Sequence, residues 1–527
     1  MAMAPLPAVG ACSSAATPTT APLLPSSASI SAFIASDLAL TLLHTRCASM
    51  AHLRQIHGAL VKSGLAKDPI AASRVVAFCC AGHDVAYAER IVRHHPRPNS
   101  FMWNTVIRAL SDGAGPGPAA ALEVFVKMLN STTPPDRRTF PSLLAACARL
   151  GHDGAALHGM AVKLGLAGDA YVRNAAIAMY ASRGRADETL ALYGPSSDFD
   201  VVACNSVIVA MARAGRVDEA RDVFDGMPDR TVATWSAMVN AYARASRCAE
   251  ALALFSEMQS AGVEPNANVL VSVLGCCAGL GALEQGAWVH AYIDRHNASM
   301  MNPLVVTALI DMYCKCGSVD KAREVFEATR SQDGMMAKLS SWNSMMQGLA
   351  VHGQWQEAVS LFSELKSYGL RPDNVTFIAV LTAYGHAGMP DEAKAAFASM
   401  EAEHDVVPGI EHYGCLVDAL ARAGRLREAE EVIRAMPVAP DAAVWGALLS
   451  GCRLHGDAET GARAAREAVR CDPSDSGAYV LAASVLARDG DAGGGAGVRG
   501  RMREAGVGKV PGCSMIEVNG VVHEFVS

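Results

Sequence analysis

The sequence has few aromatic residues and no long apolar run. Aromatics make up 6% of the 527 residues, whereas Ala and Leu recur throughout. This balance favours helices packed through small contacts over β-sheets, which are rich in β-branched and aromatic residues. A membrane-spanning helix needs about 18 or more apolar residues, and the nearest candidate, residues 28–43, is broken by Asp37. We therefore expect a helical protein without a membrane span.

The cysteines form neither a disulfide framework nor a zinc motif. Fifteen cysteines are scattered along the chain, with no C-x-x-C anywhere. This usage favours a reducing compartment with buried free thiols. The single C-x-C, Cys314 and Cys316, falls within a predicted helix, where neighbouring side chains point to different faces. Phosphate-binding, nucleophile-elbow and H-E-x-x-H motifs are also missing, so we expect no catalytic residue, no metal and no cofactor.

Positive charge is scarce as well. The net charge is −7 and the pI is near 6.1, so any nucleic-acid site must be a local groove rather than the whole surface. Residues 1–36 contain no Asp, Glu, Lys or Arg and are rich in Ala, Ser, Thr and Pro. Such a segment is typical of an organellar transit peptide, and the missing arginines favour the plastid over the mitochondrion. The alternative is a disordered tail with no targeting role.

A turn signature returns along the chain. Gly215-Arg-Val-Asp-Glu-Ala220 is followed by similar strings that begin at Gly317, Gly388 and Gly424. Gly can end a helix in the left-handed conformation, and the acidic residues suit the start of the next helix. The starts at Gly388 and Gly424 differ by 36 residues, and those at Gly317 and Gly388 differ by 71, about twice that. This spacing predicts a helix–turn–helix unit repeated every 31 to 36 residues.

One unit, residues 339–373, illustrates the pattern. Trp342, Met345, Met346 and Leu349 recur at i, i+3, i+4 and i+7, which is one face of a helix. Two helices cannot bury such faces alone, so neighbouring units must stack. The predicted fold is all-α, an α-solenoid whose units wind into a superhelix.

The repeats resemble pentatricopeptide repeats, specifically the PLS subclass of land plants. The resemblance rests on Trp103-Asn104, Trp235-Ser236 and Trp342-Asn343 in long units, and on strings such as Thr307-Ala-Leu-Ile-Asp-Met-Tyr313 in short ones. It covers more than nine-tenths of the chain. The resemblance implies a right-handed superhelix, with a partial first repeat at residues 37–68, PLS-type repeats at 69–441 and an E region at 442–527.

The E region resembles its family counterpart through Val444-Trp-Gly-Ala-Leu-Leu-Ser-Gly and through Pro511-Gly-Cys-Ser-Met-Ile-Glu-Val-Asn-Gly. Some relatives continue into a zinc deaminase domain with H-x-E and P-C-x-x-C, and this chain ends at Ser527 without those motifs. The resemblance therefore implies a non-enzymatic factor that recognises organellar single-stranded RNA for C-to-U editing, with the deaminase supplied by another protein. A glycine-rich stretch within 487–502 departs from the family and is expected to weaken a helix there.

The resemblance also implies that each repeat selects one base through an early residue of its first helix and the residue that closes the repeat. Three pairs resemble the uracil-preferring combination: Asn104 with Asp136, Asn174 with Asp200, and Asn343 with Asp373. Two resemble the adenine-preferring combination: Ser73 with Asn99, and Ser236 with Asn266. Asn205 with Thr231 suggests a pyrimidine, and Thr307 with Lys338 gives no assignment. The implied target reads A-U-n-U-Y-A-n-n-U.

Three alternatives stay open at this point. Asn and Asp beside helix starts can simply cap helices without touching RNA. The factor can act in transcript stabilisation or splicing instead of editing. A tetratricopeptide-like scaffold for protein partners would also fit the period and the acidic charge, although it lacks the W-x-x-L-G-x-x-Y pattern.

Overall fold

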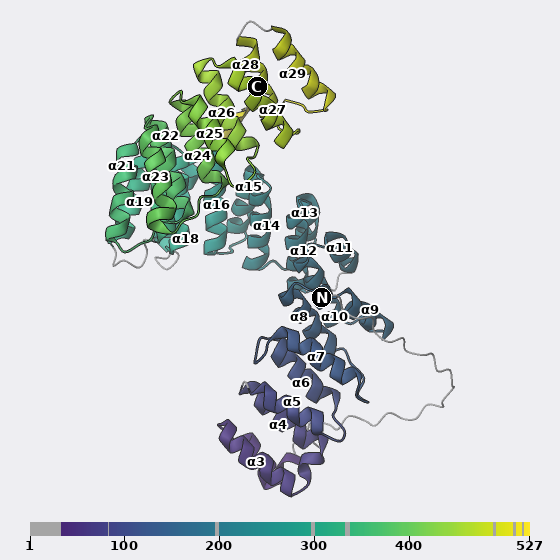
Figure 1. The fold of residues 1–527 in the computed structure, drawn as a ribbon. Helices are drawn as coiled ribbons and strands as arrows, with labels where there is room; N and C mark the ends of the chain where they lie inside the picture. Colours follow the sequence, from purple (N-terminus) through teal and green to yellow (C-terminus); the bar gives the residue numbers. More distant parts are fainter. Residues whose placement is uncertain are drawn as a thin grey trace. The chain divides into compact units, whose positions relative to one another are not determined.

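Helices follow one another in pairs along most of the chain in the computed structural model (Figure 1). The structure describes residues 33–82, 84–194, 200–296, 301–331, 338–488, 492–509, 513–518 and 521–526. The first helices of the pairs are α4 (Pro69–Ala81), α6 (Ser100–Ser111), α8 (Thr139–Leu150), α10 (Ala170–Ser182), α12 (Val201–Arg213), α14 (Val232–Arg244), α16 (Ala267–Leu280), α18 (Pro303–Lys315), α20 (Leu339–Val351), α22 (Asn374–Ala387), α24 (Ile410–Arg422) and α26 (Ala442–His455). The second helices are α5 (Val85–His94), α7 (Pro118–Leu129), α9 (Ala155–Lys163), α11 (Ala186–Tyr193), α13 (Val217–Asp225), α15 (Cys248–Ser260), α17 (Leu283–His296), α19 (Val319–Ser331), α21 (Trp355–Ser367), α23 (Pro390–His404) and α25 (Leu426–Ala435).

Additional helices lie before and after these pairs. Before α4 come α2 (Leu38–Thr45), α3 (Met50–Lys62) and the short 3-10 helix η1 (Leu65–Lys67). After α26 come α27 (Ala458–Cys471), α28 (Ser476–Arg488) and α29 (Ala492–Glu504). The glycine-rich stretch thus includes the start of a helix, and Val498 and Met502 of α29 are buried. The expected transit peptide covers residues 1–36, of which residues 1–32 lie outside the described part of the chain.

Capping residues fix where the first helices begin. Asp68 stands directly before α4, where its Oδ1 accepts hydrogen bonds from the backbone N–H groups of Ile70 and Ala71. Turn glycines fix where the first helices end, since Gly317 and Gly424 have φ of 79° and 78°, the left-handed region that favours glycine. Helices α4 and α26 thus begin at Pro69 and Ala442, directly after Asp68 and Asp441.

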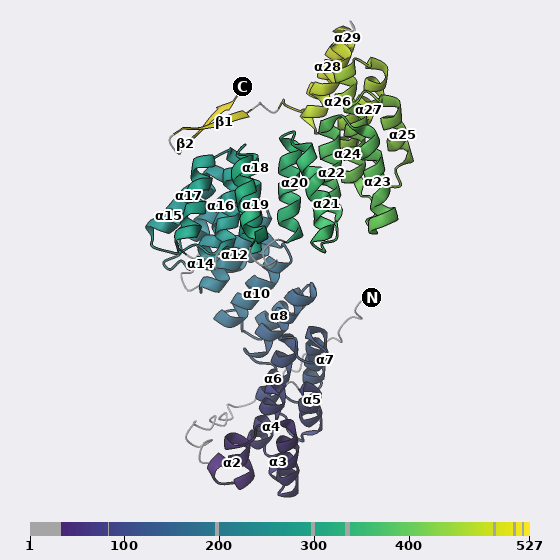
Figure 2. The same cartoon turned by 90° about the vertical axis from the view of Figure 1, so that its left-hand side faces the viewer.

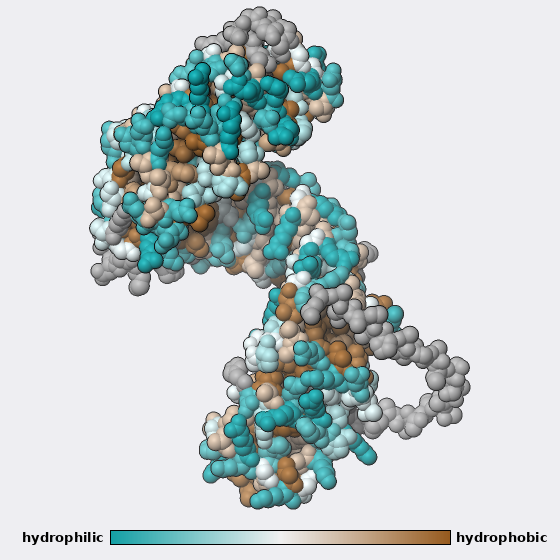
Figure 3. All heavy atoms as spheres, viewed as in Figure 1, coloured by the Kyte–Doolittle hydropathy of each residue, from teal (hydrophilic) through white to brown (hydrophobic). Residues whose placement is uncertain are grey.

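The core runs between the paired helices. Trp342, Met345, Met346 and Leu349, the stripe predicted for α20, are all buried. The Trp342 ring meets Phe326 of α19 edge to face, with centroids 5.1 Å apart. In the space-filling view the exposed face is mostly hydrophilic, and hydrophobic residues show in patches (Figure 3). The all-α prediction is confirmed for the repeats.

The chain divides into two compact units, residues 1–203 and 204–527, with the division inside α12. Phe140 and Leu144 of α8 belong to the core of the first unit, and Phe377 and Leu448 belong to a core of the second. Both residues of every predicted base-selecting pair lie within one unit. The handedness of the predicted superhelix stays a prediction.

The C-terminal segment adds a short β-hairpin to the otherwise all-α fold. Strands β1 (Cys513–Val518) and β2 (Val521–Val526) form an antiparallel hairpin in which Val518 pairs with Val521. Figure 2 shows this hairpin near α17, and Glu517 accepts hydrogen bonds from the N–H groups of Glu284 and Gln285 at the start of that helix. The signal was present in the sequence, because Asn519-Gly520 between β-branched residues is typical of a hairpin turn.

Candidate nucleic-acid interface

The seven predicted pairs occupy equivalent places in the structure. Each early residue is the fifth residue of a first helix, and each closing residue lies just before the next first helix. The early residues are Ser73, Asn104, Asn174, Asn205, Ser236, Thr307 and Asn343. Because first helices such as α18, α20 and α22 pack side by side, the fifth residue of one helix can reach the start of the next.

All three uracil-type pairs are joined by a hydrogen bond. Asn104 Nδ2 donates to Asp136 Oδ1 at 2.8 Å, and Asn343 Nδ2 donates to Asp373 Oδ1 at 3.0 Å. Asn174 Nδ2 donates to Asp200 Oδ2 at 2.7 Å. A carboxylate accepts and cannot donate, so it must face the amide nitrogen and not the amide oxygen. The closing residue therefore sets the orientation of the amide.

The adenine-type pairs are also in contact. Asn99 Nδ2 donates to Ser73 Oγ at 3.2 Å. Ser236 Oγ lies 3.3 Å from Asn266 Oδ1. Each serine hydroxyl also donates to a backbone carbonyl one turn earlier, Pro69 and Val232 respectively. These two sites therefore present an amide from the closing residue, whereas the uracil-type sites present an amide from the helix.

Two predicted pairs are not joined. Asn205 makes no hydrogen bond to Thr231, and its Oδ1 is buried without a partner. Thr307 forms hydrogen bonds with the hydroxyls of Ser340 and Ser341 rather than with Lys338. Lys338 is exposed and its side chain does not cap α20. For these two pairs the resemblance implied only a pyrimidine and no assignment, respectively.

Capping and pairing coexist in the same closing residues. Asn99 Oδ1 accepts from the N–H of Met102 at 2.9 Å, and Asp373 Oδ1 accepts from the N–H of Thr376 at 2.9 Å. The early residues lie inside their helices and cap nothing. The capping interpretation is therefore correct for these closing residues, and it does not exclude their contact with the early residue.

Sequence reasoning missed a third member of two uracil-type sites. Thr139 Oγ1 donates to Asn104 Oδ1 at 2.7 Å, and Thr376 Oγ1 donates to Asn343 Oδ1 at 2.8 Å. Both threonines are fully buried. Each follows its aspartate by three residues, so a search for Asp-x-x-Thr would have found them.

Charge is divided unequally between the two helices of the repeats. In the described helices α4–α26, the first helices carry nine Lys or Arg against three Asp or Glu. The second helices carry thirteen against twenty-four. Exposed cations recur in the last turn of first helices: Arg108, Arg149, Arg213, Arg244, Lys315 and Arg422. The acidic net charge therefore belongs mainly to the second helices. Arg149, Lys315 and Arg422 pair with Asp112, Asp311 and Asp418, so an anionic ligand is favoured mainly beside Arg108, Arg213 and Arg244.

A hollow of about 590 Å³ in the second unit lies along this face. Helices α12, α14 and α16 supply most of its lining, including Arg213, Arg244 and Asn240, which is hydrogen-bonded to Ser272. The hollow extends across several first helices and is not an enclosed cavity of the kind that holds a small molecule. None of the fourteen predicted base-selecting residues lines it, so the hollow is a basic part of the first-helix surface and not itself one of the paired sites.

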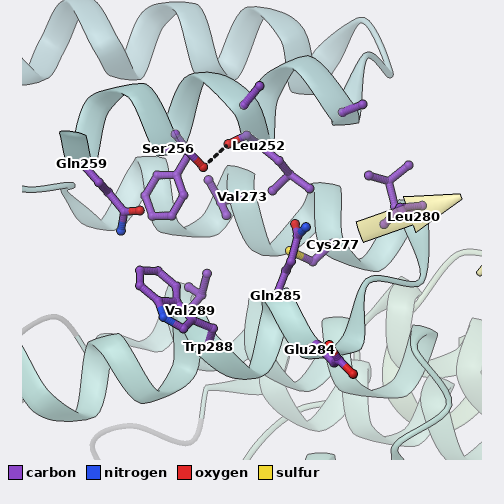
Figure 4. A pocket seen from close by; sticks show the side chains of 14 residues that line it. Leu252, Ser256, Gln259, Val273, Cys277, Leu280, Glu284, Gln285, Trp288 and Val289 are labelled. Carbon is purple, nitrogen blue, oxygen red and sulfur yellow. Dashed lines mark hydrogen bonds between the residues drawn. The ribbon is translucent and has the colours of Figure 1, made fainter. Parts of the chain in front are cut away.

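Another hollow, of about 630 Å³, lies elsewhere in the second unit, between α15, α16 and α17 (Figure 4). Its lining is mainly apolar and includes Phe255, Val289 and the half-exposed Trp288, with Val522 of β2 nearby. None of the fourteen predicted base-selecting residues lines it. This hollow is therefore separate from the paired sites.

Burial disfavours the thiolate form of both cysteines in the C-x-C string, Cys314 and Cys316. Burial raises the pKa of Cys314 to about 12 and that of Cys316 to about 11, so neither thiol is poised as a thiolate. Within the described ranges, no group of three His, Cys, Asp or Glu side chains is placed to hold a metal ion.

None of the described helices has both the length and the apolar character needed to cross a membrane.

Stacked helix pairs with a polar contact repeated at equivalent positions define a helical-repeat protein. Models described as PPR repeats match residues 202–232, 230–278, 305–331, 338–386, 375–404 and 411–439, and the E motif matches 455–517. The pentatricopeptide repeat-containing protein At2g42920, chloroplastic, of Arabidopsis thaliana is 48% identical, covering 96% of this chain and 90% of the relative. Its counterpart At5g66520 from the same plant is 44% identical, covering 92% and 77%. The crystal structure of pentatricopeptide repeat protein PPR10 from maize matches with a TM-score of 0.49 and 17% identity, over 92% of this chain and 79% of that one.

The chain belongs to the pentatricopeptide repeat family. Its repeats and E motif agree with the PLS subclass inferred from the sequence.

Proposed function

We propose that the protein binds single-stranded RNA in an organelle and selects the cytidine for C-to-U editing, with the deaminase supplied by another protein. The repeats read successive bases through the fifth residue of the first helix and the residue that closes the repeat. The protein itself performs no chemistry and needs no cofactor in this role.

One observation carries the RNA-binding part. Five of the seven predicted pairs are in contact across successive repeats, in register, on the helices that carry the basic excess. An amide held in this way can donate to the edge of an unstacked base, and nearby cations can meet the phosphates. A scaffold for protein partners gives no reason for this recurrence.

The editing part is supported by the E motif at 455–517, which in the family resemblance implies recruitment of a deaminase. The plastid is supported by a relative whose name is chloroplastic and by the uncharged residues 1–36.

RNA recognition is tested by fluorescence anisotropy with A-U-n-U-Y-A-n-n-U RNA. The double variant Asn104→Leu, Asn343→Leu should lose about tenfold or more in affinity, because each leucine removes a donor to a base. The control is Asn130→Leu at the exposed end of α7, which should bind like the unaltered protein. Equal affinity in all three, with the helical content unchanged, contradicts RNA readout.

The cellular role is tested by sequencing organellar transcripts from plants with and without the protein. A cytidine that stays unconverted downstream of the implied target supports editing. If every site is edited normally but the length or abundance of a bound transcript changes, the role is stabilisation or splicing.

A further inference from the structure

Two uracil-type sites contain a closed ring of hydrogen bonds. The backbone N–H of Asp136 donates to Thr139 Oγ1 at 2.9 Å, and that hydroxyl donates to Asn104 Oδ1. Asn104 Nδ2 then donates back to Asp136 Oδ1. The same ring joins Asp373, Thr376 and Asn343, where the backbone bond is 3.1 Å.

The ring fixes which atoms of the amide remain available. A hydroxyl has one proton, and in each ring its closest side-chain acceptor is the asparagine oxygen. Flipping the amide would place its oxygen against a carboxylate oxygen, which also only accepts. The amide oxygen is thus turned toward the threonine and one Nδ2 proton is used, so the second Nδ2 proton is the donor left for a base.

Other asparagines in the array lack this lock. Asn174 donates to Asp200, but the residue three places after Asp200 is Ala203, and Asn174 Oδ1 is buried without a partner. Asn205 Oδ1 is also without a partner, although a buried threonine, Thr234, follows Thr231 by three residues. Thr234 instead bonds back to Thr231. Threonine hydroxyls three residues after the closing residue therefore differ in whether they bond to the asparagine amide of the preceding repeat.

We propose that Thr139 and Thr376 are positioning residues that set base specificity, an inference that rests on the proposed RNA binding. By drawing the amide oxygens of Asn104 and Asn343 toward themselves, they turn the amide nitrogen, a donor, toward the base. A donor can form a hydrogen bond to the O4 carbonyl of uracil. It cannot do so with cytosine at this position, because the amino group of cytosine is itself a donor. The threonines touch no base, and act through the asparagine.

The test measures the ratio of affinities for U and C at single nucleotides of the A-U-n-U-Y-A-n-n-U RNA, using the full chain. Asn104 is paired with the second nucleotide and Asn343 with the ninth. Thr139→Val should lower the U/C ratio at the second nucleotide by roughly two- to tenfold and leave the ninth unchanged, because one hydrogen bond to the amide is lost. Thr376→Val should do the reverse. Thr139→Ser and Thr376→Ser retain the hydroxyl and should retain the ratio.

Thr234→Val is the matched control. Thr139, Thr234 and Thr376 are all buried threonines whose hydroxyls accept from the backbone N–H of the closing residue, so all three variants lose a similar helix-start contact. Thr234→Val should lower thermal stability like the others and leave the U/C ratio at every nucleotide unchanged.

The outcomes separate this inference from the function on which it rests. If the unaltered protein discriminates U from C at the second and ninth nucleotides and the valine variants discriminate equally well, the inference is wrong and the function stands. A ratio that falls at all nucleotides together, or that serine fails to retain, means a purely structural role and also overturns it. An unaltered protein that binds no RNA overturns the proposed function itself.

Discussion

The first and second helices of the repeats share one core but are joined to their neighbours by different chemistry. First helices are connected by amide and hydroxyl side chains that reach the start of the next first helix, as Asn343 reaches Asp373. Second helices are connected by ion pairs. Arg247 Nη1 lies 2.6 Å from Asp218 Oδ1, and Arg425 Nη1 lies 2.6 Å from Asp391 Oδ1 of the preceding second helix.

This difference shows that a net charge can mislead about a repeat protein. The acidic residues of the second helices are largely engaged with arginines, as in Glu428, where Arg425 and then Lys394 lower the pKa of the carboxyl to about 2. By contrast, Arg213 and Arg244 of the first helices are exposed and make no ion pair within the described part of the chain. A chain of net charge −7 can thus offer a locally basic face.

The largest expected effect comes from neutralising that face. The double variant Arg213→Gln, Arg244→Gln should weaken RNA binding by roughly tenfold at physiological salt, because two phosphate contacts are lost. The slope of log affinity against log salt should decrease by about 1.4, about 0.7 for each contact with a single strand. Anisotropy titrations over a range of salt concentrations measure both quantities.

The control removes the same charge from the second helices. Lys321 and Arg427 are exposed on α19 and α25, and Lys321→Gln with Arg427→Gln should leave the affinity and the salt slope unchanged. Equal losses in the two double variants would mean that RNA responds to net charge alone, and the distinction between the two sets of helices would fail.

A smaller effect is expected at a contact between a second and a first helix. His158 of α9 lies 3.2 Å from the Tyr180 hydroxyl of α10, and burial lowers the pKa of the imidazole. The unfolded chain takes up this proton near the ordinary value of 6.5, and the folded chain takes it up only at lower pH. The free energy of unfolding is therefore at its full value above about pH 6.5 and falls as the pH decreases below 6.5.

Thermal unfolding measured from about pH 7.5 to about pH 5.5 tests this sign. His158→Phe should show a smaller loss of thermal stability across this window than the unaltered protein, because the ring no longer titrates. His152→Phe, at an exposed position before α9, should keep the original pH dependence. The same loss in all three proteins would exclude His158 as the titrating group.

The smallest effect is expected from a single ion pair between second helices. Arg323 of α19 makes two hydrogen bonds of 2.8 Å to the Glu357 carboxylate of α21, and both side chains are partly exposed. Glu357→Gln, which removes this pair and leaves that of Arg323 with Asp320 in place, should lower the free energy of unfolding by about 0.2–1 kcal/mol, and by less in high salt. Glu324→Gln removes a carboxylate of α19 that makes no ion pair within the described part of the chain, and it should change the free energy of unfolding less; denaturant titrations measure both. A loss several times larger would show that the pair behaves as a buried one.

Much of the fold could be predicted from local patterns. Gly215, Gly317 and Gly424 marked helix ends because few other residues adopt the left-handed conformation cheaply. Asp68 and Asn302 marked helix starts because their side chains accept from the first N–H groups. The hairpin at the C-terminus was not predicted, because residues 513–526 were assigned only to the tail of the E region, although Asn519-Gly520 is a hairpin signal.

The candidate site was predictable only in part. The fifth-residue and closing positions followed from the family resemblance, and five of the seven pairs are in contact. The two that are not, Asn205 with Thr231 and Thr307 with Lys338, occupy the same positions of the repeat as the others. Which hydroxyl or amide actually meets its neighbour depends on the packing between successive first helices.

The sequence by itself determined the repeat, its boundaries and the residues placed at equivalent positions, because caps, turns and apolar spacing act over a few residues along one helix. The tertiary structure decided how those positions combine. It brought Thr139 to Asn104, thirty-five residues away, while leaving Thr234 bonded to its own helix start. It also decided which charged side chains form ion pairs, as Arg247 does with Asp218, and which stay exposed, as Arg213 does. These outcomes depend on distances between stacked helices, and only the packing of whole repeats against one another sets those distances.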